Sequence, residues 1–188
     1  SFTYKEGLDL DVYQAVKDSS QNRPVLLLVH GGGFASGQRN GKLESDFMKQ
    51  MAQYGYVGVS MSYRLLRKGQ GFGCDCPASE KETTFLEATR DIYAATQYLK
   101  DHSKKLRINP LEIILAGSSA GAEAVLNAAF MQQTQAYEAL REAPISYAGL
   151  ISFAGAILDA DQIQSNNAIP SLLFHGKKDN LVPFGRAA

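Results

Sequence analysis

The pattern of apolar and polar positions along this chain predicts short strands separated by helices. Residues 8–13 alternate apolar and polar side chains, which is typical of an edge strand with one face in water. Residues 25–29 form a continuous apolar run between Pro24 and a glycine cluster, as in a strand that is buried on both faces. Similar patterns predict further strands over residues 57–61, 112–116, 149–153 and 171–174.

Between these strands the apolar positions recur at helical spacing. In residues 43–54, the side chains of Leu43, Phe47, Met51 and Tyr54 share one face of a predicted helix. The same period predicts helices over residues 79–101 and 120–131, and a shorter helical piece over residues 134–142.

The alternation of strand and helix after the first strand predicts the α/β fold class. Such a chain forms a mostly parallel sheet with helices on both faces, and ligands bind beyond the carboxyl ends of its strands. Asn109-Pro110 is expected to break the chain before the strand at 112–116. At 188 residues, the whole of residues 1–188 is predicted to form a single domain with a sizeable core.

Composition and charge argue against some classes of binding partner. The hydrophobic fraction of 45% and the charged fraction of 20% are ordinary for a globular protein, and 19 Lys+Arg balance 19 Asp+Glu. The absence of a basic block argues against nucleic acid and against electrostatic docking on membranes. The longest apolar run, residues 25–29, is too short for stable insertion into a membrane. The chain starts at Ser1, as after removal of a leader from a secreted or periplasmic protein or after a cut, so compartment and oligomeric state stay open.

The two cysteines, Cys74 and Cys76, are separated by a single residue. A disulfide between such close neighbours is strained, and a zinc site needs two further ligands, which the three histidines do not supply at a metal-like spacing. We therefore interpret both as free or incidental thiols, and the sequence predicts no metal and no cofactor.

A candidate nucleophile follows the strand predicted at 112–116. The segment Gly117-Ser118-Ser119-Ala120-Gly121 matches G-x-S-x-G and lies directly between a strand and a helix. A serine on such a tight turn needs small residues two positions before and two positions after it, and only Ser119 has glycine at both. The helix that begins at Ala120 directs free amides towards the charge that develops there. The alternative is a tight strand–helix connection without chemistry.

A second glycine-rich segment, His30-Gly31-Gly32-Gly33-Phe34, follows the buried strand at 25–29. Successive glycines let the backbone approach a substrate and direct N–H groups at it, as an oxyanion hole requires. A phosphate cradle is disfavoured because G-x-G-x-x-G and G-K-[ST] patterns are absent. We interpret His30 as a support of this loop, since it directly precedes the glycines, rather than as a base.

Together these motifs resemble the α/β-hydrolase superfamily, in particular the carboxylesterase and hormone-sensitive-lipase-like esterases with an H-G-G-G motif. The resemblance runs from about Leu8 to the end of the chain, and includes Tyr63-Arg64 after a strand, the helix at 91–99 and Asn109-Pro110.

The resemblance implies an α/β-hydrolase fold, and assigns the oxyanion hole to the backbone amides of Gly32, Gly33 and Ala120. Two positions depart from the usual pattern of the lipase-like group. This chain has Ser118 where that group usually has Asp, and Ala122 where it often has Gly. These departures loosen the assignment to the subgroup, and esterases of plant-polysaccharide esters and dienelactone-hydrolase-like proteins stay close alternatives.

The segment from Leu172 to Pro183 resembles the H-G-x-x-D-x-x-V-P segment of the family, in which the aspartate is the acid of the catalytic triad. This places Asp179 just past a strand end, where a carboxylate orients an imidazole and stabilises its charged form. A turn aspartate that caps the next element is the structural alternative. Asp159 and Asp161 are the second choices for the acid.

The general base is not evident in the sequence. The triad order in this fold is Ser, acid, His, and no histidine follows Asp179. His102 is expected at the polar end of a helix, and His175 in the turn before Asp179. The simplest expectation is that the chain is C-terminally incomplete, without the last strand, the last helix and the catalytic histidine. As written, it is expected to be nearly inactive.

Three functions follow as hypotheses. The first is a serine hydrolase that cleaves carboxylic esters of small molecules through an acyl-enzyme intermediate. The second is a serine peptidase of the prolyl-oligopeptidase type, and the third is a catalytically dead α/β-hydrolase fold used for binding. Substrate choice would depend on the loops at 65–78 and 131–144, and Phe34 and Phe72 either line a pocket there or pack in the core.

Overall fold

One seven-stranded sheet organises the computed structural model, which describes residues 1–73, 75–141, 143 and 145–185. The strands lie in the order β1-β2-β4-β3-β5-β6-β7. The five neighbouring strands β4, β3, β5, β6 and β7 are parallel to one another. At one edge β2 pairs antiparallel with β4, and β1 pairs antiparallel with β2. Their bounds are β1 Phe2–Lys5, β2 Leu8–Tyr13, β3 Arg23–Val29, β4 Val57–Met61, β5 Ile108–Ser118, β6 Gly149–Phe153 and β7 Ser171–Phe174.

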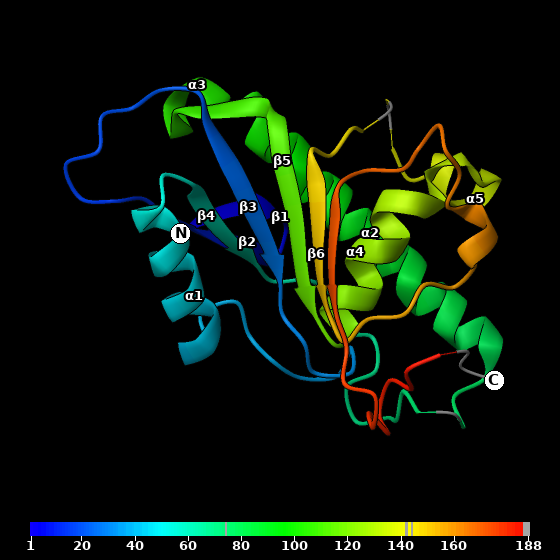
Figure 1. The fold of residues 1–188 in the computed structure, drawn as a ribbon. Helices are drawn as coiled ribbons and strands as arrows, with labels where there is room; N and C mark the ends of the chain where they lie inside the picture. Colours follow the sequence, from blue (N-terminus) through cyan, green and yellow to red (C-terminus); the bar gives the residue numbers. More distant parts are fainter. Residues whose placement is uncertain (74, 142, 144, 186–188) are drawn as a thin grey trace.

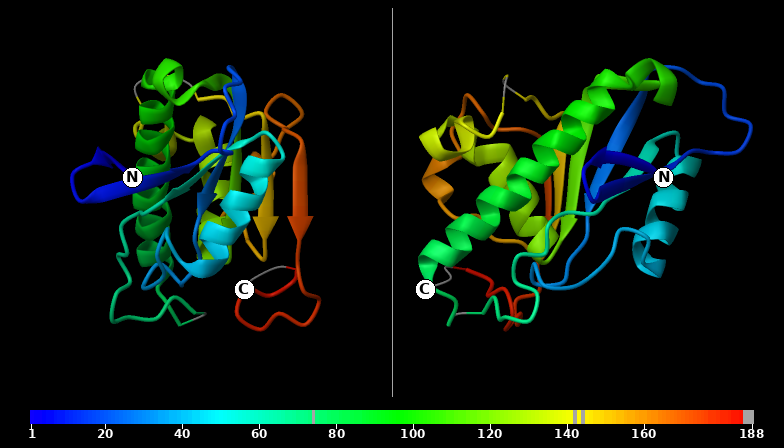
Figure 2. Two further views of the ribbon diagram at one scale, coloured as in Figure 1. Left: turned by 90° about the vertical axis from the view of Figure 1, so that its left-hand side faces the viewer. Right: turned by 180° about the vertical axis from the view of Figure 1, so that it is seen from behind.

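Helices cover both faces of the sheet, as the alternating pattern predicts (Figure 1). On one face α1 packs on β3 and β4, while on the other α4 packs on β5 and β6 and α2 packs against α4. Figure 2 shows the long α2 crossing the back of the sheet. The bounds are α1 Lys42–Gln53, α2 Ala78–Asp101, α3 Ser103–Leu106, α4 Ala120–Phe130 and α5 Gln135–Glu138, with 3-10 turns η1 Met131–Gln133 and η2 Ala160–Gln162.

The central strand β3 explains why residues 25–29 are all apolar. Leu26 and Leu28 pack towards Met48 of α1, and the alternate side chains, including Leu27, join the larger core on the α4 side. Burial on both faces removes the polar half of the usual alternation. The predicted α/β architecture, a mostly parallel sheet with helices on both faces, is therefore confirmed.

Two details of the sheet differ from the sequence prediction. Residues 8–13 form β2, but β1 pairs with its outer side, so β2 is not the edge strand. The strand predicted at 112–116 is the inner part of the much longer β5, which starts at Ile108. The predicted break at Asn109-Pro110 is therefore wrong. A register shift against β3 accommodates Pro110, because a strand tolerates proline at an irregularity of its ladder.

The helical prediction over 134–142 was too long. Only α5, of four residues, forms there, after the 3-10 turn η1. Residues 142 and 144, at the end of the predicted helix and of the loop 131–144, lie outside the described residues.

The far edge of the sheet is apolar and exposed. In β7, Leu172, Leu173 and Phe174 are 58%, 66% and 53% exposed, although they come from both faces of the strand. Within the described part of the chain, β7 pairs with β6 alone. The expectation that a further strand and helix cover this edge is consistent with that exposure, and it stays a prediction.

A buried ion pair fastens α2 to the antiparallel side of the sheet. The carboxylate of Asp91 is fully buried, and its Oδ1 accepts hydrogen bonds from Lys5 Nζ at 2.9 Å and from Arg64 Nη2 at 2.8 Å. Its Oδ2 accepts from the backbone N–H and the Nε of Arg64, at 3.0 and 2.9 Å. A buried carboxylate with this many donors is satisfied only while every partner is in place.

Candidate active site

Ser119 lies on the turn between β5 and α4, as the strand–turn–helix pattern predicts. Its backbone has φ 51° and ψ −124°, a conformation that a residue with a side chain adopts only when its surroundings hold it there. One of the restraints is visible, because the Ser119 N–H donates a hydrogen bond of 2.8 Å to the carbonyl of Phe153 at the end of β6. A strained strand–turn–helix connection of this kind is the geometry that a G-x-S-x-G motif predicts.

The two glycines of the turn are required by close backbone contacts. A Cβ at Gly117 would overlap the carbonyl oxygen of Gly121 and lie 2.6 Å from the amide nitrogen of Ala122. A Cβ at Gly121 would overlap the carbonyl oxygen of Val29 and lie 2.6 Å from that of His30. The G-x-S-x-G spacing therefore lets α4 start directly against the end of β3.

We expect Gly121→Ala to destabilise the fold by about 1–3 kcal/mol, the usual range for overpacking, because the added Cβ meets backbone atoms that cannot rotate away. Urea unfolding followed by circular dichroism measures this change. Gly71→Ala is the matched control, since a Cβ there meets no atom within 4 Å and should change stability by less than about 0.5 kcal/mol. Equal stabilities of the two variants would contradict this account of the turn.

The glycine loop after β3 lies against the elbow because β3 and β5 are neighbouring strands. A Cβ at Gly31 would lie 3.3 Å from the Cβ of Ser119, and Gly32 and Gly33 have φ values of 119° and 61°. Space opens around Gly33, where a Cβ would meet nothing within 4 Å. The amide of Ala120, in the first turn of α4, has no partner within the helix. The glycine loop thus lies against Ser119 at the start of α4.

His30 lies in the core beneath this loop and is only 2% exposed. Its Nδ1 is 2.7 Å from the carbonyl oxygen of Gly31, and the hydroxyl of Tyr63 donates to the His30 carbonyl at 3.0 Å. The imidazole also packs on the ring of Tyr63, with centroids 4.6 Å apart. Burial lowers the pKa of His30, so the ring is neutral at physiological pH. These contacts are those of a residue that supports the loop.

Phe34 and Phe72, for which the sequence allows either a pocket wall or the core, pack against each other and against the core. Phe34 is fully buried despite a φ of 56°, and its ring centroid is 4.6 Å from that of Phe72. Both rings contact Phe85 of α2. The side chain of Arg67 donates to the carbonyl of Gly71 at 2.9 Å and pairs with Glu80, which fixes the loop above them.

Asp179 lies just past β7, on the edge of the sheet where the strands end. Its Oδ1 accepts hydrogen bonds of 2.9 Å from the backbone amides of Leu181 and Val182. These bonds lower the pKa of the carboxyl, so it is ionised at neutral pH. Its Oδ2 is 3.8 Å from Nε2 of His175, whose Nε2 is also 2.7 Å from the carbonyl of Val182. In this structure Asp179 and His175 together shape the turn.

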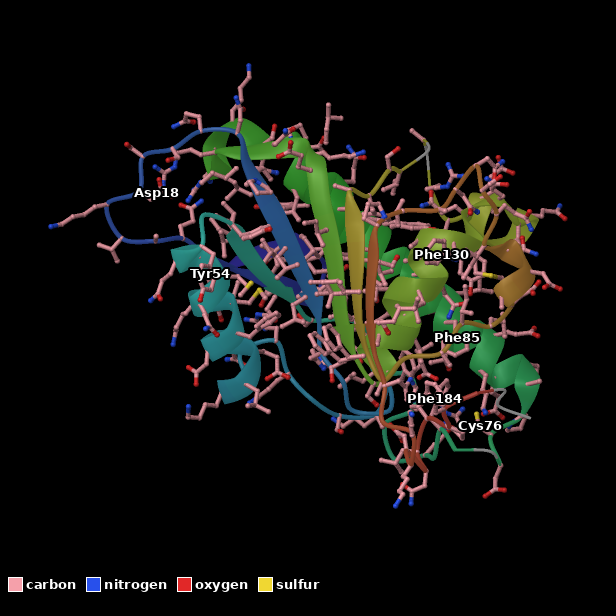
Figure 3. All side chains as sticks on the ribbon, in the orientation of Figure 1. Asp18, Tyr54, Cys76, Phe85, Phe130 and Phe184 are labelled. Carbon is pink, nitrogen blue, oxygen red and sulfur yellow. The ribbon has the colours of Figure 1, made fainter. Side chains whose placement is uncertain are left out.

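The alternative acids lie elsewhere on the same edge. Asp159 caps the 3-10 turn η2 by accepting a hydrogen bond from the amide of Asp161 at 3.0 Å. Both aspartates line a cleft of about 600 Å³ that Leu126 of α4, His175 and the segment at Phe184 also border. Figure 3 shows Phe184 and Cys76 on this edge of the molecule, beyond the ends of the strands.

None of the three histidines is placed as a base for Ser119. His102 caps the C-terminus of α2, where its Nδ1 is 2.8 Å from the carbonyl of Tyr98 and its ring stacks on Tyr98. That end of α2 lies opposite the elbow, near α3 (Figure 1). His30 and His175 are held by the loop and the turn described above. The structure brings together the elbow and the glycine loop, but none of these three imidazoles makes a hydrogen bond to Ser119.

Other candidate sites are few in the described residues. No group of three or more His, Cys, Asp or Glu is placed to hold a metal ion within them. Cys76 is a free thiol, and Cys74 lies outside the described residues. No helix in the described ranges combines the length and the apolar character needed to cross a membrane.

Sequence reasoning missed one polar side chain near the elbow. Glu123 is the single charged residue of α4, whose other ten residues are all buried. A lone acidic residue in an otherwise apolar helix that follows a nucleophile elbow was the available signal.

Comparison with known proteins shows sequence similarity to lipases and esterases. Lipase 2 of Moraxella sp. (strain TA144) is 31% identical over 123 residues, which are 62% of this chain and 25% of that protein. Esterase B1 of Culex pipiens is 29% identical over 122 residues, 64% of this chain and 22% of its own length. The chain thus spans about a quarter of the length of these curated relatives.

Among solved structures, a thermophilic esterase of Thermogutta terrifontis with bound butyrate superposes with a TM-score of 0.71 at 19% identity, covering 96% of this chain and 72% of that one. The same esterase phosphonylated by sarin gives a TM-score of 0.69 at 19% identity, with 96% and 73% covered.

The family model BD-FAE matches residues 10–157, which include the glycine loop, the elbow, most of β2 and the whole of β3, β4, β5 and β6. The similarity to esterases and lipases agrees with the α/β-hydrolase resemblance in the motifs. The chain therefore belongs to the BD-FAE family of the α/β-hydrolase superfamily.

Proposed function

We propose that this chain carries the nucleophile and oxyanion hole of a serine hydrolase that cleaves carboxylic esters through an acyl-enzyme intermediate. The observation that carries the proposal is the strained backbone of Ser119, held on the β5–α4 turn beside the glycine loop. Backbone strain of this kind clusters at active sites, where the surrounding structure holds it. The esterases and lipases among the relatives support ester cleavage over peptide cleavage.

In the proposed reaction Ser119 Oγ attacks the ester carbonyl while a histidine base takes its proton, and the amides of Gly32, Gly33 and Ala120 bind the oxyanion that forms. The tetrahedral intermediate then collapses as the base gives this proton to the departing alcohol. Water, which loses a proton to the same base, then attacks the acyl-enzyme, and the acid leaves as Ser119 Oγ regains its proton. The phosphonyl adduct of the Thermogutta esterase supports an activated nucleophile in this fold. Preorganised backbone donors of this kind contribute several kcal/mol to the stability of the intermediate.

Asp179 is the proposed acid of the triad. Its carboxyl is ionised and lies past the end of β7, where a charged acid can orient an imidazole and stabilise the imidazolium. We further propose that the general base is a histidine other than His30, His102 and His175, each of which is held elsewhere by the contacts above. The exposed outer edge of β7 supports a further segment of chain that brings this histidine beside Asp179.

The decisive experiment uses the product of the complete reading frame that contains this chain. It should hydrolyse short p-nitrophenyl esters such as the butyrate, and a fluorophosphonate probe should label the tryptic peptide that contains Ser119. The same protein is tested on aminoacyl anilides, which a serine peptidase would cleave. Cleavage of the anilides but not the esters would contradict the proposal, as would an unlabelled Ser119.

A further inference from the structure

One side chain, that of Tyr63, contacts both ends of the glycine loop. Tyr63 lies two residues past the end of β4, and β4 is the parallel neighbour of β3, with Met61 opposite Val29. The residues just past the ends of these two strands therefore lie side by side. Tyr63 is only 2% exposed, and the proposed reaction assigns it no role.

The contacts of Tyr63 are with the residues on either side of the three glycines. Its hydroxyl donates a hydrogen bond of 3.0 Å to the carbonyl of His30, and its ring packs on the imidazole with centroids 4.6 Å apart. Its ring also meets that of Phe34 edge to face, at a centroid distance of 6.0 Å. Burial raises the pKa of Tyr63, so the hydroxyl keeps its proton and is a donor at neutral pH. His30 and Phe34 are thus fixed against the same ring.

His30 transmits this restraint to one donor of the proposed oxyanion hole. A carbonyl oxygen only accepts, so the 2.7 Å contact between Nδ1 of His30 and the oxygen of Gly31 places a hydrogen on Nδ1. A trans peptide unit directs its C=O and its N–H in opposite directions. The N–H of Gly32 belongs to the same peptide unit and therefore points away from the imidazole. Its orientation follows from that of the His30 ring.

The second donor of the loop is oriented in the same way. The carbonyl of Gly32 accepts hydrogen bonds of 3.0 Å from the backbone amides of the two residues that follow Phe34. The N–H of Gly33 belongs to this peptide unit, so it points away from those amides. Because Phe34 leads into this turn, its packing on Tyr63 fixes the segment that orients the Gly33 amide.

Tyr63 is itself anchored through its two neighbours in the chain. The hydroxyl of Ser62 donates to the carbonyl of Asp9 in β2 and accepts from the amide of Asp9, both at 2.9 Å. The amide of Arg64 donates to the buried carboxylate of Asp91 in α2 at 3.0 Å. Tyr63 is therefore a fixed point between the sheet and α2, whereas three successive glycines have little conformational preference of their own.

We propose that Tyr63 is a positioning residue of the oxyanion hole, which fixes the glycine loop so that the amides of Gly32 and Gly33 are oriented before the substrate binds. This role rests on the proposed ester cleavage at Ser119. The loop lies against the nucleophile, since a Cβ at Gly31 would be 3.3 Å from the Cβ of Ser119. Oxyanion donors act through preorganisation, so a loop that is free to reorient stabilises the transition state less.

Tyr63→Phe removes the hydroxyl and keeps the ring, so it tests the bond to the His30 carbonyl. In the complete protein it should lower kcat for p-nitrophenyl butyrate by about tenfold and leave KM within about twofold, because the oxyanion exists only along the reaction. A trifluoromethyl ketone forms a tetrahedral adduct with a serine nucleophile. Its affinity should fall by the same factor as kcat, because the oxyanion of the adduct uses the same amides.

Tyr93→Phe is the matched control for a purely structural effect. Tyr93 is 3% exposed, and its hydroxyl donates to the carbonyl of Ala128 at 3.0 Å, a bond of the same kind between α2 and α4. The urea midpoints of the two variants should fall by similar amounts, because each loses one buried hydrogen bond. Only Tyr63→Phe should lower kcat. An equal loss of kcat in Tyr93→Phe would assign the effect to stability and overturn the positioning role.

Hydrogen–deuterium exchange of the 188-residue chain gives a readout that does not depend on catalysis. The amides of Ala35 and Ser36, which bond to the Gly32 carbonyl, should exchange faster in Tyr63→Phe and at an unchanged rate in Tyr93→Phe. Unchanged exchange at these amides, or an unchanged kcat, in Tyr63→Phe would overturn the role of Tyr63 while ester cleavage stands. Absence of hydrolysis by the unmodified complete protein would overturn the proposed function, and this role with it.

Discussion

Ser119→Ala is expected to lower the kcat/KM of the complete protein for p-nitrophenyl butyrate by on the order of 10⁴–10⁶-fold. The variant keeps the glycine loop and the Ala120 amide, so any residual rate reflects binding and the oxyanion hole alone. It loses the only atom proposed to form the acyl-enzyme. The measurement is a full kinetic comparison, supported by the loss of fluorophosphonate labelling at the peptide that contains residue 119.

Two variants serve as controls for Ser119→Ala. Ser118→Ala changes the neighbouring hydroxyl, which is exposed at the end of β5, and should keep activity within about threefold, since surface changes rarely exceed 0.5 kcal/mol. Ser119→Gly should lose activity equally but unfold at higher urea, because glycine adopts a φ of 51° without strain. Substantial hydrolysis by Ser119→Ala would refute the assignment of the nucleophile.

Asp91→Ala is expected to destabilise the 188-residue chain by about 3–5 kcal/mol, the usual loss when one partner of a buried ion pair is removed. The substitution leaves Arg64 and Lys5 without their shared carboxylate and removes the acceptor for the Arg64 amide. Because Asp91 is fully buried, salt should screen the pair weakly, so the loss should persist in 1 M NaCl. Urea unfolding in both salt conditions measures it.

Asp101→Ala provides the control on the same helix. Asp101 is exposed at the end of α2, where it accepts a hydrogen bond of 2.8 Å from Gln97, and its loss should change stability by less than about 0.5 kcal/mol. A destabilisation of Asp91→Ala below about 1 kcal/mol would mean that the buried network is not a significant anchor between α2 and the sheet.

The candidate site was predicted from sequence where its geometry is a local matter. The requirement for small residues around Ser119 follows from the steric conflict within one tight turn, so the spacing of Gly117 and Gly121 was sufficient to find it. The glycine loop and the elbow each follow a predicted buried strand, so the sequence also predicted that both lie at the carboxyl ends of the parallel strands. The triad role of Asp179 stays a prediction, because the contacts in the structure are those of a turn.

Other features required contacts that a linear pattern does not contain. The strand runs through Asn109-Pro110 instead of starting after it, because Ile108 already pairs with Arg23 of β3 and the pairing resumes at Ile113 after a register shift. The strand at residues 8–13 was assigned to the edge because nothing in its own alternation reveals that β1 pairs beside it. Phe34 was undecided between pocket and core until the rings from α2 and the loop above it were in place.

The sequence by itself thus determined the order of strands and helices, the elbow at Ser119 and the glycine loop, because periodicity and steric limits act over a few neighbouring residues. Only the tertiary structure decided that the loop lies against the elbow, that Asp91 binds Lys5 86 positions away, and that burial raises the pKa of Glu123 to about 7. The physical reason is that burial and charge pairing depend on which distant segments meet, and a pattern of neighbouring residues does not contain that information.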